Sequence, residues 1–138
     1  MQLKVKPMKF SVKEAQQTNS VADLVMCLLN SVTTAHIMHL QTPSYAEHMA
    51  LGAFYEEVGD LVDSFVESYQ GKYGLIQNYP KTYELPADEP TSYLKALGAE
   101  LEQYRRQPGF PQDTELQNEL DNVANLINQT IYKLRFLN

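Results

Sequence analysis

The amino-acid sequence predicts an all-α protein, a four-helix bundle in which a long crossover joins the second and third helices. Three observations support this fold class. Apolar residues recur every three or four positions through four separate stretches, which is the period of an amphipathic helix. No stretch alternates apolar and polar residues with the period of two that is typical of a strand. Clusters of proline and glycine lie between the stretches, where helices are expected to end.

The first predicted helix ends near residue 40 and has two candidate starts. Ser11 with Glu14, and Ser20 with Asp23, each show the serine-x-x-acid spacing of a capping box. We therefore expect this helix to run from about Ser11 or Ser20 to Leu40. Its inner stripe is expected to consist of Val21, Val25, Leu28, Val32, Ala35 and His39.

The second predicted helix runs from Ser44 to about Tyr69. Pro43 ends the preceding helix, Ser44 and Glu47 form a capping box, and Gly71 is expected to follow the end of the helix. Because only a few residues separate the first two helices, we expect them to pack as an antiparallel hairpin that turns at residues 41–44. The buried stripe of the second helix is expected to be Leu51, Phe54, Val58, Leu61, Phe65 and Tyr69.

The rest of the chain predicts a second pair of helices. Residues 71–90 are rich in glycine, asparagine and proline and form the expected crossover. A third helix is expected at about residues 91–104 and a fourth at about 113–137, with prolines at 108 and 111 between them. Two hairpins joined by one crossover make an up-down-down-up bundle.

Charge is distributed unevenly along the 138 residues. The first 13 residues hold four lysines and no acid, so the remaining 125 residues hold all 17 acidic and 7 of the 11 basic side chains, a net charge of −10. An acidic body disfavours a broad nucleic-acid-binding face, because phosphate contacts need clustered cations. We expect a basic N-terminal arm at residues 1–13 and a bundle at 14–138. The arm is either a solvated tail or a weak DNA contact through Lys4, Lys6, Lys9 and Lys13.

The expected location is the cytoplasm. Uninterrupted apolar runs such as Leu24–Leu29 are short, which predicts no membrane-spanning segment, and no apolar stretch follows Met1 as in a secretory signal. The single cysteine, Cys27, has no partner for an internal disulfide. We expect it to be a small apolar side chain of the core.

All three histidines of the chain lie within 13 residues of each other. His36 and His39 are three residues apart near the end of the first helix, and His48 lies in the first turn of the second. An antiparallel hairpin would bring the three rings together, and imidazole is a ligand for zinc, copper or iron. The alternative is that these are polar side chains at a solvated end of the bundle.

Acidic residues on the second helix are candidate partners for the histidines. Asp63 and Glu67 are four residues apart, so their carboxylates share one helix face. A di-iron centre within one chain is not expected, since residues 24–46 hold no acid and no Glu-x-x-His occurs in the sequence. His48 lies 15 residues before Asp63, which is about 22 Å along a helix. These groups could share a metal ion only between two chains.

The segment HMALGAFYEEVGDLVDSFVE, from His48 to Glu67, resembles the second-helix motif of the Dps family of mini-ferritins. In that motif a histidine is followed by an acid four residues later, and then by Asp and Glu at fifteen and nineteen, the positions of Asp63 and Glu67. Gly52 stands where the family has the first acid.

Two further segments extend the resemblance. His36-Ile37-Met38-His39 is similar to the family's His-x-x-His, and IYKLRFL at residues 131–137 is similar to its closing Trp-Met-Leu-Arg stretch. The resemblance therefore covers roughly residues 20–137. The chain also looks like the small ferritin-like proteins encoded by tailed phages.

The resemblance implies a ferritin-like homo-oligomer, a dimer or a dodecamer, that binds iron at a site between subunits and oxidises it. His39 and His48 of one chain and Asp63 and Glu67 of another are the implied ligands, with zinc as a surrogate metal. The spacing from His39 to His48 is nine residues where the family has twelve, and His36 restores twelve. An aspartate at position 52 would supply the missing acid. The alternative is a non-catalytic ferritin-like structural or interaction protein, encoded by a phage, whose metal site is degenerate.

Overall fold

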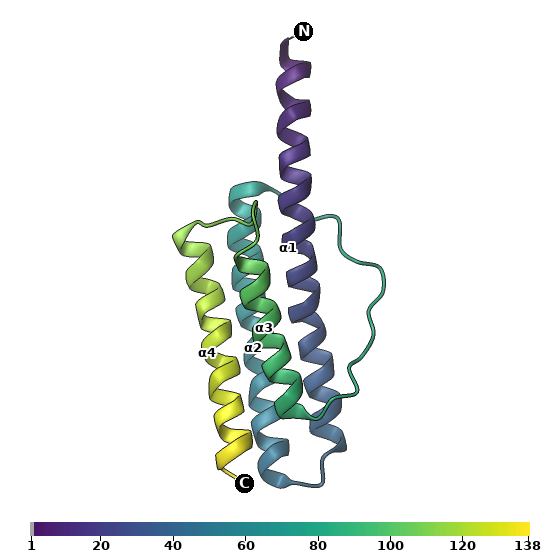
Figure 1. The fold of residues 1–138 in the computed structure, drawn as a ribbon, viewed down its shortest axis with the longest axis vertical. Coiled ribbons are helices and arrows are strands. Elements are labelled where there is room, and N and C mark those ends of the chain that lie inside the picture. The colour runs from purple at the N-terminus through teal and green to yellow at the C-terminus, as the bar shows by residue number, and fades with distance from the viewer. Residues whose placement is uncertain (1) are drawn as a thin grey trace.

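The computed structural model describes residues 2–138, with side chains from residue 20 onward, and contains four helices (Figure 1). They are α1 (Gln2–Gln41), α2 (Tyr45–Tyr73), α3 (Pro90–Arg105) and α4 (Thr114–Phe136). No strand occurs among residues 2–138. The prediction of an all-α, four-helix fold is confirmed.

The four helices pack as a ring in which each helix touches two others. The contacting pairs are α1 with α2, α2 with α4, α4 with α3, and α3 with α1. Figure 1 shows α1 and α2 antiparallel, and the crossover at residues 74–89 returns along the length of the bundle before α3 begins. As a result α3 runs parallel to α2, and α4 runs antiparallel to α3. The C-terminus lies at the same end of the bundle as the turn between α1 and α2.

The first helix is longer than the sequence predicted. It begins at Gln2 and passes through both candidate caps, at Ser11 and at Ser20, without a break. No glycine or proline occurs at residues 10–20, so nothing stops the helix from propagating past the serines. Its first turns project beyond the rest of the bundle (Figure 1). The basic segment predicted at residues 1–13 is therefore continuous in backbone with α1 from Gln2 onward.

The start of α2 was predicted correctly and its end was not. The Ser44 side chain accepts a hydrogen bond from the Glu47 backbone N–H at 3.2 Å, as the capping box requires. The helix continues through Gly71, which was expected to follow its end, and stops at Tyr73. Gly74 is the residue that ends it, because its φ of +96° suits glycine and its N–H donates to the Gln70 carbonyl at 3.0 Å.

The predicted inner stripes form the core of the bundle. On α1 the fully buried members are Val21, Val25, Leu28 and Ala35, and on α2 they are Leu51, Phe54, Val58 and Phe65. Val32 and Leu61 are only half-buried, while Val62, beside Leu61, is buried in its place. The helical period thus located the buried faces to within one residue.

One segment of the described helices, Ser20–Gln41, is long and apolar enough to cross a membrane by length and composition, with 22 residues and a mean hydropathy of 1.4. The expectation that no segment would qualify was wrong, because it considered only uninterrupted apolar runs. Half of this segment is buried inside the bundle. Packing against α2 and α3 accounts for its apolar character.

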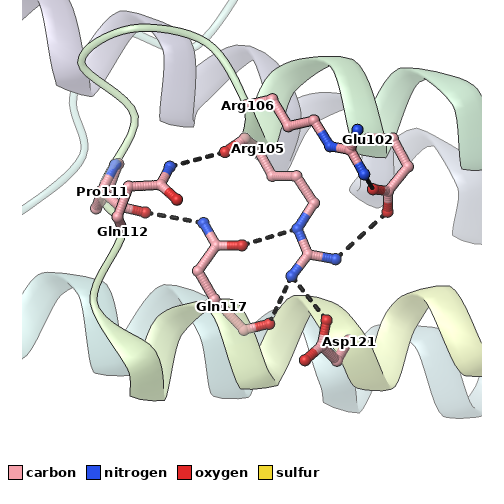
Figure 2. Close-up of polar contacts among 7 residues, drawn as sticks. All are labelled: Glu102, Arg105, Arg106, Pro111, Gln112, Gln117 and Asp121. Atoms are coloured by element: carbon pink, nitrogen blue, oxygen red, sulfur yellow. Dashed lines mark hydrogen bonds and ion pairs between the residues drawn. The ribbon is translucent and has the colours of Figure 1, made fainter.

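Arg105 ties the end of α3 to the start of α4 (Figure 2). Its Nε donates to the Gln117 side chain at 2.8 Å, and its Nη2 donates to the Gln117 carbonyl at 3.0 Å and to Asp121 at 2.7 Å. Gln117 in turn donates to the Pro111 carbonyl at 2.9 Å. The Arg105 side chain is only 12% exposed, so its planar fork of donors is held in one geometry.

Replacing Arg105 tests how much its hydrogen bonds contribute to the free energy of unfolding. We expect Arg105→Ala to lower the free energy of unfolding by about 2–3 kcal/mol, because the Gln117 carbonyl and Asp121 lose their donor. Urea unfolding followed by circular dichroism measures the change. The matched control is Arg106→Ala, whose side chain is 78% exposed and should cost less than about 0.5 kcal/mol. Equal losses in the two variants would contradict this role.

A second polar link joins the end of α2 to the start of α4. The Asp113 carboxylate pairs with Lys72 and accepts the Tyr73 hydroxyl at 2.8 and 3.0 Å. The hydrogen bond from Lys72 has the largest effect on the pKa of Asp113 and lowers it; partial burial opposes this effect, and the bond from Tyr73 lowers the pKa further. Asp113 is therefore held in its charged form.

This link predicts a pH-dependent contribution to stability. Because the folded-state pKa of Asp113 is lowered, the contact stabilises the protein above the unfolded-state pKa and is lost as the pH falls through the folded-state value. We expect Asp113→Asn to be less stable than the wild type at pH 7. The difference should shrink as the pH falls from about 5 to below about 3. Urea unfolding across this range measures it, and a difference independent of pH would argue against the ionic contact.

Candidate functional site

The histidines meet at the α1–α2 hairpin, as their spacing predicted, and two of them form a reciprocal pair. The rings of His39 and His48 stack with centroids 3.6 Å apart and planes 19° apart. The Nδ1 atom of His39 lies 2.6 Å from the His48 carbonyl oxygen, and the Nδ1 atom of His48 lies 2.8 Å from the His39 carbonyl oxygen. We call this pair the histidine clasp.

The hydrogen bonds of the clasp determine where the ring protons are. A carbonyl oxygen only accepts, so both Nδ1 atoms must carry a hydrogen and donate it. In the neutral ring the lone pair is then on Nε2, and neither Nε2 atom makes a hydrogen bond within residues 20–138. Metal-binding histidines usually have this arrangement, in which the other ring N–H donates to a backbone carbonyl or a carboxylate. Each ring of the clasp therefore presents one oriented nitrogen ligand, and because the rings are stacked 19° from parallel, their two lone pairs do not point at one place.

The clasp also closes the hairpin. The His39 carbonyl is among the last four of α1, which lack a partner within the helix. The His48 ring supplies that partner from the first turns of α2. The same two side chains therefore hold the helix ends together whether or not a metal ion binds.

Gly52 leaves room for the His39 ring. A Cβ atom at position 52 would lie 3.1 Å from Cε1 and 3.2 Å from Nδ1 of His39, closer than such contacts normally come. The ring thus occupies the space where the Dps-like motif would place an acidic side chain. An aspartate here, expected to supply a missing ligand, would bring its Cβ atom against the His39 ring, which would have to shift by a few tenths of an ångström.

His36 and Tyr55 extend the cluster beyond the clasp. The exposed His36 ring stacks on Tyr55 with centroids 4.3 Å apart and lies 6.0 Å from the His39 ring. Tyr55 also packs edge-on to His39 at 5.3 Å. The sequence analysis missed Tyr55, although its position seven residues after His48 places it on the same face of α2. His36 is therefore a neighbour of the clasp and not a member of it.

The predicted acidic ligands are not brought to the histidines within one chain. Asp63 and Glu67 are exposed further along α2, toward the crossover end, and neither makes an ion pair with residues 20–138. Within that part of the chain no group of three or more His, Cys, Asp or Glu side chains is placed to hold a metal ion. The four lysines of the proposed DNA contact, Lys4, Lys6, Lys9 and Lys13, precede the residues whose side chains the structure describes.

Comparison with known proteins gives a family relationship. The profile of a family of unknown function, DUF5856, matches residues 39–134, which extend from the clasp through α4. The chain belongs to the DUF5856 family. This DUF5856 protein is also similar to a protein of Enterobacteria phage T4, described as an uncharacterized 14.6 kDa protein in the mobD-ri intergenic region, at 30% identity over 130 residues. The match covers 92% of this chain and 98% of the phage protein. No solved structure matches.

The similarity supports a phage relationship for this DUF5856 protein. Neither description mentions ferritin, Dps or iron. The family match begins at His39 and includes His48, so it contains both members of the clasp. It also contains Gly52, Asp63 and Glu67.

The packing of Gly52 gives a direct test of the clasp. Alanine normally raises helix stability over glycine by about 0.5–1 kcal/mol. We expect Gly71→Ala to show that gain, since nothing lies within 4 Å of its Cβ position. Gly52→Ala should instead lose stability, because its methyl group pushes on the His39 ring. Thermal unfolding compares the two variants, and equal gains would show that the ring moves freely.

Proposed function

We propose that this DUF5856 protein is a ferritin-like oligomer that binds a transition-metal ion at the histidine clasp, with carboxylates of a second copy completing the site. The observation that carries this proposal is the free Nε2 lone pair on both His39 and His48, whose Nδ1 atoms are held by backbone carbonyls. His36 is an additional nitrogen ligand at the edge of the clasp.

The arrangement of helices supports the ferritin-like part of the proposal. Ferritin-like bundles join two antiparallel hairpins by one long crossover. Here α1 pairs with α2 and α3 pairs with α4, and residues 74–89 join the two hairpins. The motif at residues 48–67 adds the resemblance to Dps proteins.

A two-fold axis explains how the ligands would meet. Glu56 lies halfway along α2 between the clasp and the two acidic residues. If two copies of α2 cross antiparallel at that point, each clasp faces Asp63 and Glu67 of the other copy, and two equivalent sites form. Both acids are exposed and have no ion-pair partner among residues 20–138. Their carboxylates are therefore accessible to a metal ion bound to a second chain.

Exposed apolar side chains beside the clasp support an interface between subunits. Leu40, Tyr45 and Met49 are 70%, 76% and 53% exposed at the hairpin turn. Apolar groups gathered on a surface mark interaction sites more often than isolated ones do. We propose a homo-oligomer, a dimer or a dodecamer, in the cytoplasm of the host cell.

Iron is the metal that we propose, and zinc is a surrogate for the same ligands. Imidazole and carboxylate ligands suit both ions. With iron bound, the chemistry available is oxidation of the ferrous ion by dioxygen or peroxide. The chain itself supplies the oriented imidazoles and the carboxylates.

One observation favours a second candidate, a non-catalytic structural or interaction protein. The Nδ1 hydrogen bonds of the clasp already account for both histidines as a closure of the hairpin. The His39 ring lies against Gly52, where the Dps-like motif has an acid. In this alternative the protein keeps the bundle and its exposed surface and binds no metal.

Asparagine at position 48 separates the two candidates. The asparagine amide can donate to the His39 carbonyl as the histidine Nδ1 does, but it offers no Nε2 ligand. We expect His48→Asn to keep most of the wild-type stability and to lose zinc binding, while His48→Ala loses both. Isothermal titration with zinc and thermal unfolding measure the two effects. Unchanged zinc affinity in His48→Asn would exclude the clasp as the site.

Mixing two defective variants tests whether the site lies between subunits. His39→Asn/His48→Asn lacks the nitrogen ligands, and Asp63→Ala/Glu67→Ala lacks the carboxylates. Neither variant should bind zinc tightly alone, but unfolding and refolding them together in equal amounts should restore about a quarter of the sites, because about half of the pairs are mixed and each mixed pair has one complete site of its two. Asp60→Ala is the control for loss of an exposed acid on α2. Full zinc binding by the Asp63→Ala/Glu67→Ala variant would contradict the shared site.

A further inference from the structure

The outward face of α4 carries a stripe of uncharged side chains. Six exposed residues recur on it at intervals of four, three, four, three and four, which keeps them on one side of the helix. We call this the amide stripe, and its members are Asn118, Asn122, Asn125, Gln129, Tyr132 and Phe136. The buried residues of α4, among them Leu120, Ile127 and Leu134, lie on the opposite side of the helix. The stripe therefore faces away from its own bundle.

The composition of the amide stripe is that of an interface. The outward face of α2 shows the usual alternative, with exposed carboxylates at the same spacing, namely Glu56, Asp60, Asp63 and Glu67. Asparagine forms helices less readily than lysine or glutamate, so contact with water alone does not favour it on a helix. Centres of protein interfaces are depleted in charged residues and enriched in aromatic ones. Tyr132 and Phe136 at one end of the stripe are 54% and 64% exposed.

Charge is polarised along α4. Its three acids lie in its first eight residues and its two basic residues lie in its last four; they are Glu115, Glu119 and Asp121, and Lys133 and Arg135. This order suits the helix dipole. It also means that two copies of α4 attract each other when they pack antiparallel and repel each other when they pack parallel.

One antiparallel register satisfies the whole stripe. If a two-fold axis relates two copies of α4 at the level of Ile127, each residue lies level with the one equally far on the other side of position 127 in the other copy. The amide stripe is symmetric about that position, so its members form three facing pairs. The pairs are Phe136 with Asn118, Tyr132 with Asn122, and Gln129 with Asn125 of the other copy.

The charges beside the stripe fit the same register. On one flank Glu119 comes within two residues, about 3 Å, of the level of Lys133 in the other copy. On the other flank Asp121 and Arg135 have the same relation. Glu119, Lys133 and Arg135 make no ion pair within residues 20–138. Asp121 uses one of its two carboxylate oxygens, on Arg105, and its other oxygen is available to a second cation (Figure 2).

A second copy of the chain is the partner that this surface fits. Each amide carries donors and an acceptor, so an amide of one copy can bind an amide of the other, and a two-fold contact needs such self-complementarity. We propose that α4 packs antiparallel on α4 of a second copy through the amide stripe. This contact lies on a different helix from the proposed metal site and does not depend on it. A protein that forms both contacts assembles beyond a dimer.

Charge exchange across the stripe tests the contact. Sedimentation equilibrium of the full chain, with EDTA present to exclude metal bridges, measures self-association. Glu119→Lys opposes like charges at both facing pairs, and so does Lys133→Glu, so each variant alone should associate about tenfold more weakly than the wild type. An equimolar mixture should associate within about threefold of the wild type, because both facing pairs are again opposite in charge.

The matched control moves the same charge changes to the crossover. Glu84→Lys and Lys81→Glu alter the net charge equally at exposed positions, and Figure 1 shows the crossover on the far side of the bundle from α4. These variants, alone or mixed, should change self-association by less than about twofold. Equal behaviour of the two sets would mean only general charge attraction and would overturn the proposed contact.

Asn125→Lys tests the stripe itself. Lysine is the better helix former, so the thermal stability of the dilute protein should stay the same or rise. Two lysines close to the two-fold axis should nevertheless weaken self-association about tenfold. Unchanged self-association of Asn125→Lys, or a wild type that stays monomeric at millimolar concentration, would overturn the proposal.

Discussion

The exchange of hydrogen bonds between His39 and His48 determines how closely α1 and α2 approach at their shared end. Each ring must reach the backbone of the opposite helix, so a side chain at position 52 would press on the His39 ring. Gly52 meets that requirement at the usual cost of a glycine inside a helix, about 1 kcal/mol. The short turn at residues 42–44 is possible because the two helix ends are already bound to each other. The orientation of His36 and Tyr55 follows from the same contact.

Local sequence signals predicted the elements of the fold, and they failed where two signals competed. The capping box at Ser44 was unambiguous because Pro43 stands before it, and the helix begins there. Ser11 and Ser20 carry the same pattern without a proline directly before them, and α1 passes through both. The sequence predicts that α2 ends before Gly71, but of these two glycines it is Gly74 that adopts a positive φ and ends the helix. The residue types alone do not show which serine begins a helix or which glycine ends one, because that depends on the backbone conformation each residue adopts.

The candidate sites differ in how much of each the sequence could show. The histidine cluster was predictable because helical spacing and a short turn are enough to bring its members together. The orientation of the rings, and so the free nitrogen on each, depends on contacts across the helices that no spacing specifies. A pocket of about 320 Å³ could not be predicted, because its lining comes from three segments far apart in the sequence, α1, the crossover and α3.

The bundle consists of two helical hairpins, and in each hairpin side-chain hydrogen bonds hold the two helices together near the turn. The histidine clasp joins α1 to α2 across the three residues 42–44, and Arg105 joins α3 to α4 across the eight residues 106–113. Contacts between partners close in sequence form early in folding, because little chain entropy is lost in closing a short loop. We therefore expect each hairpin to form before the two hairpins pack together. The crossover only has to be long enough to let them meet. We expect the docking of α4 on α2 and of α3 on α1 to follow as the slower step, because it joins segments far apart in the sequence. The unfolding rate should accordingly depend more on the apolar contacts between the hairpins than on the histidine clasp or the Arg105 hydrogen bonds.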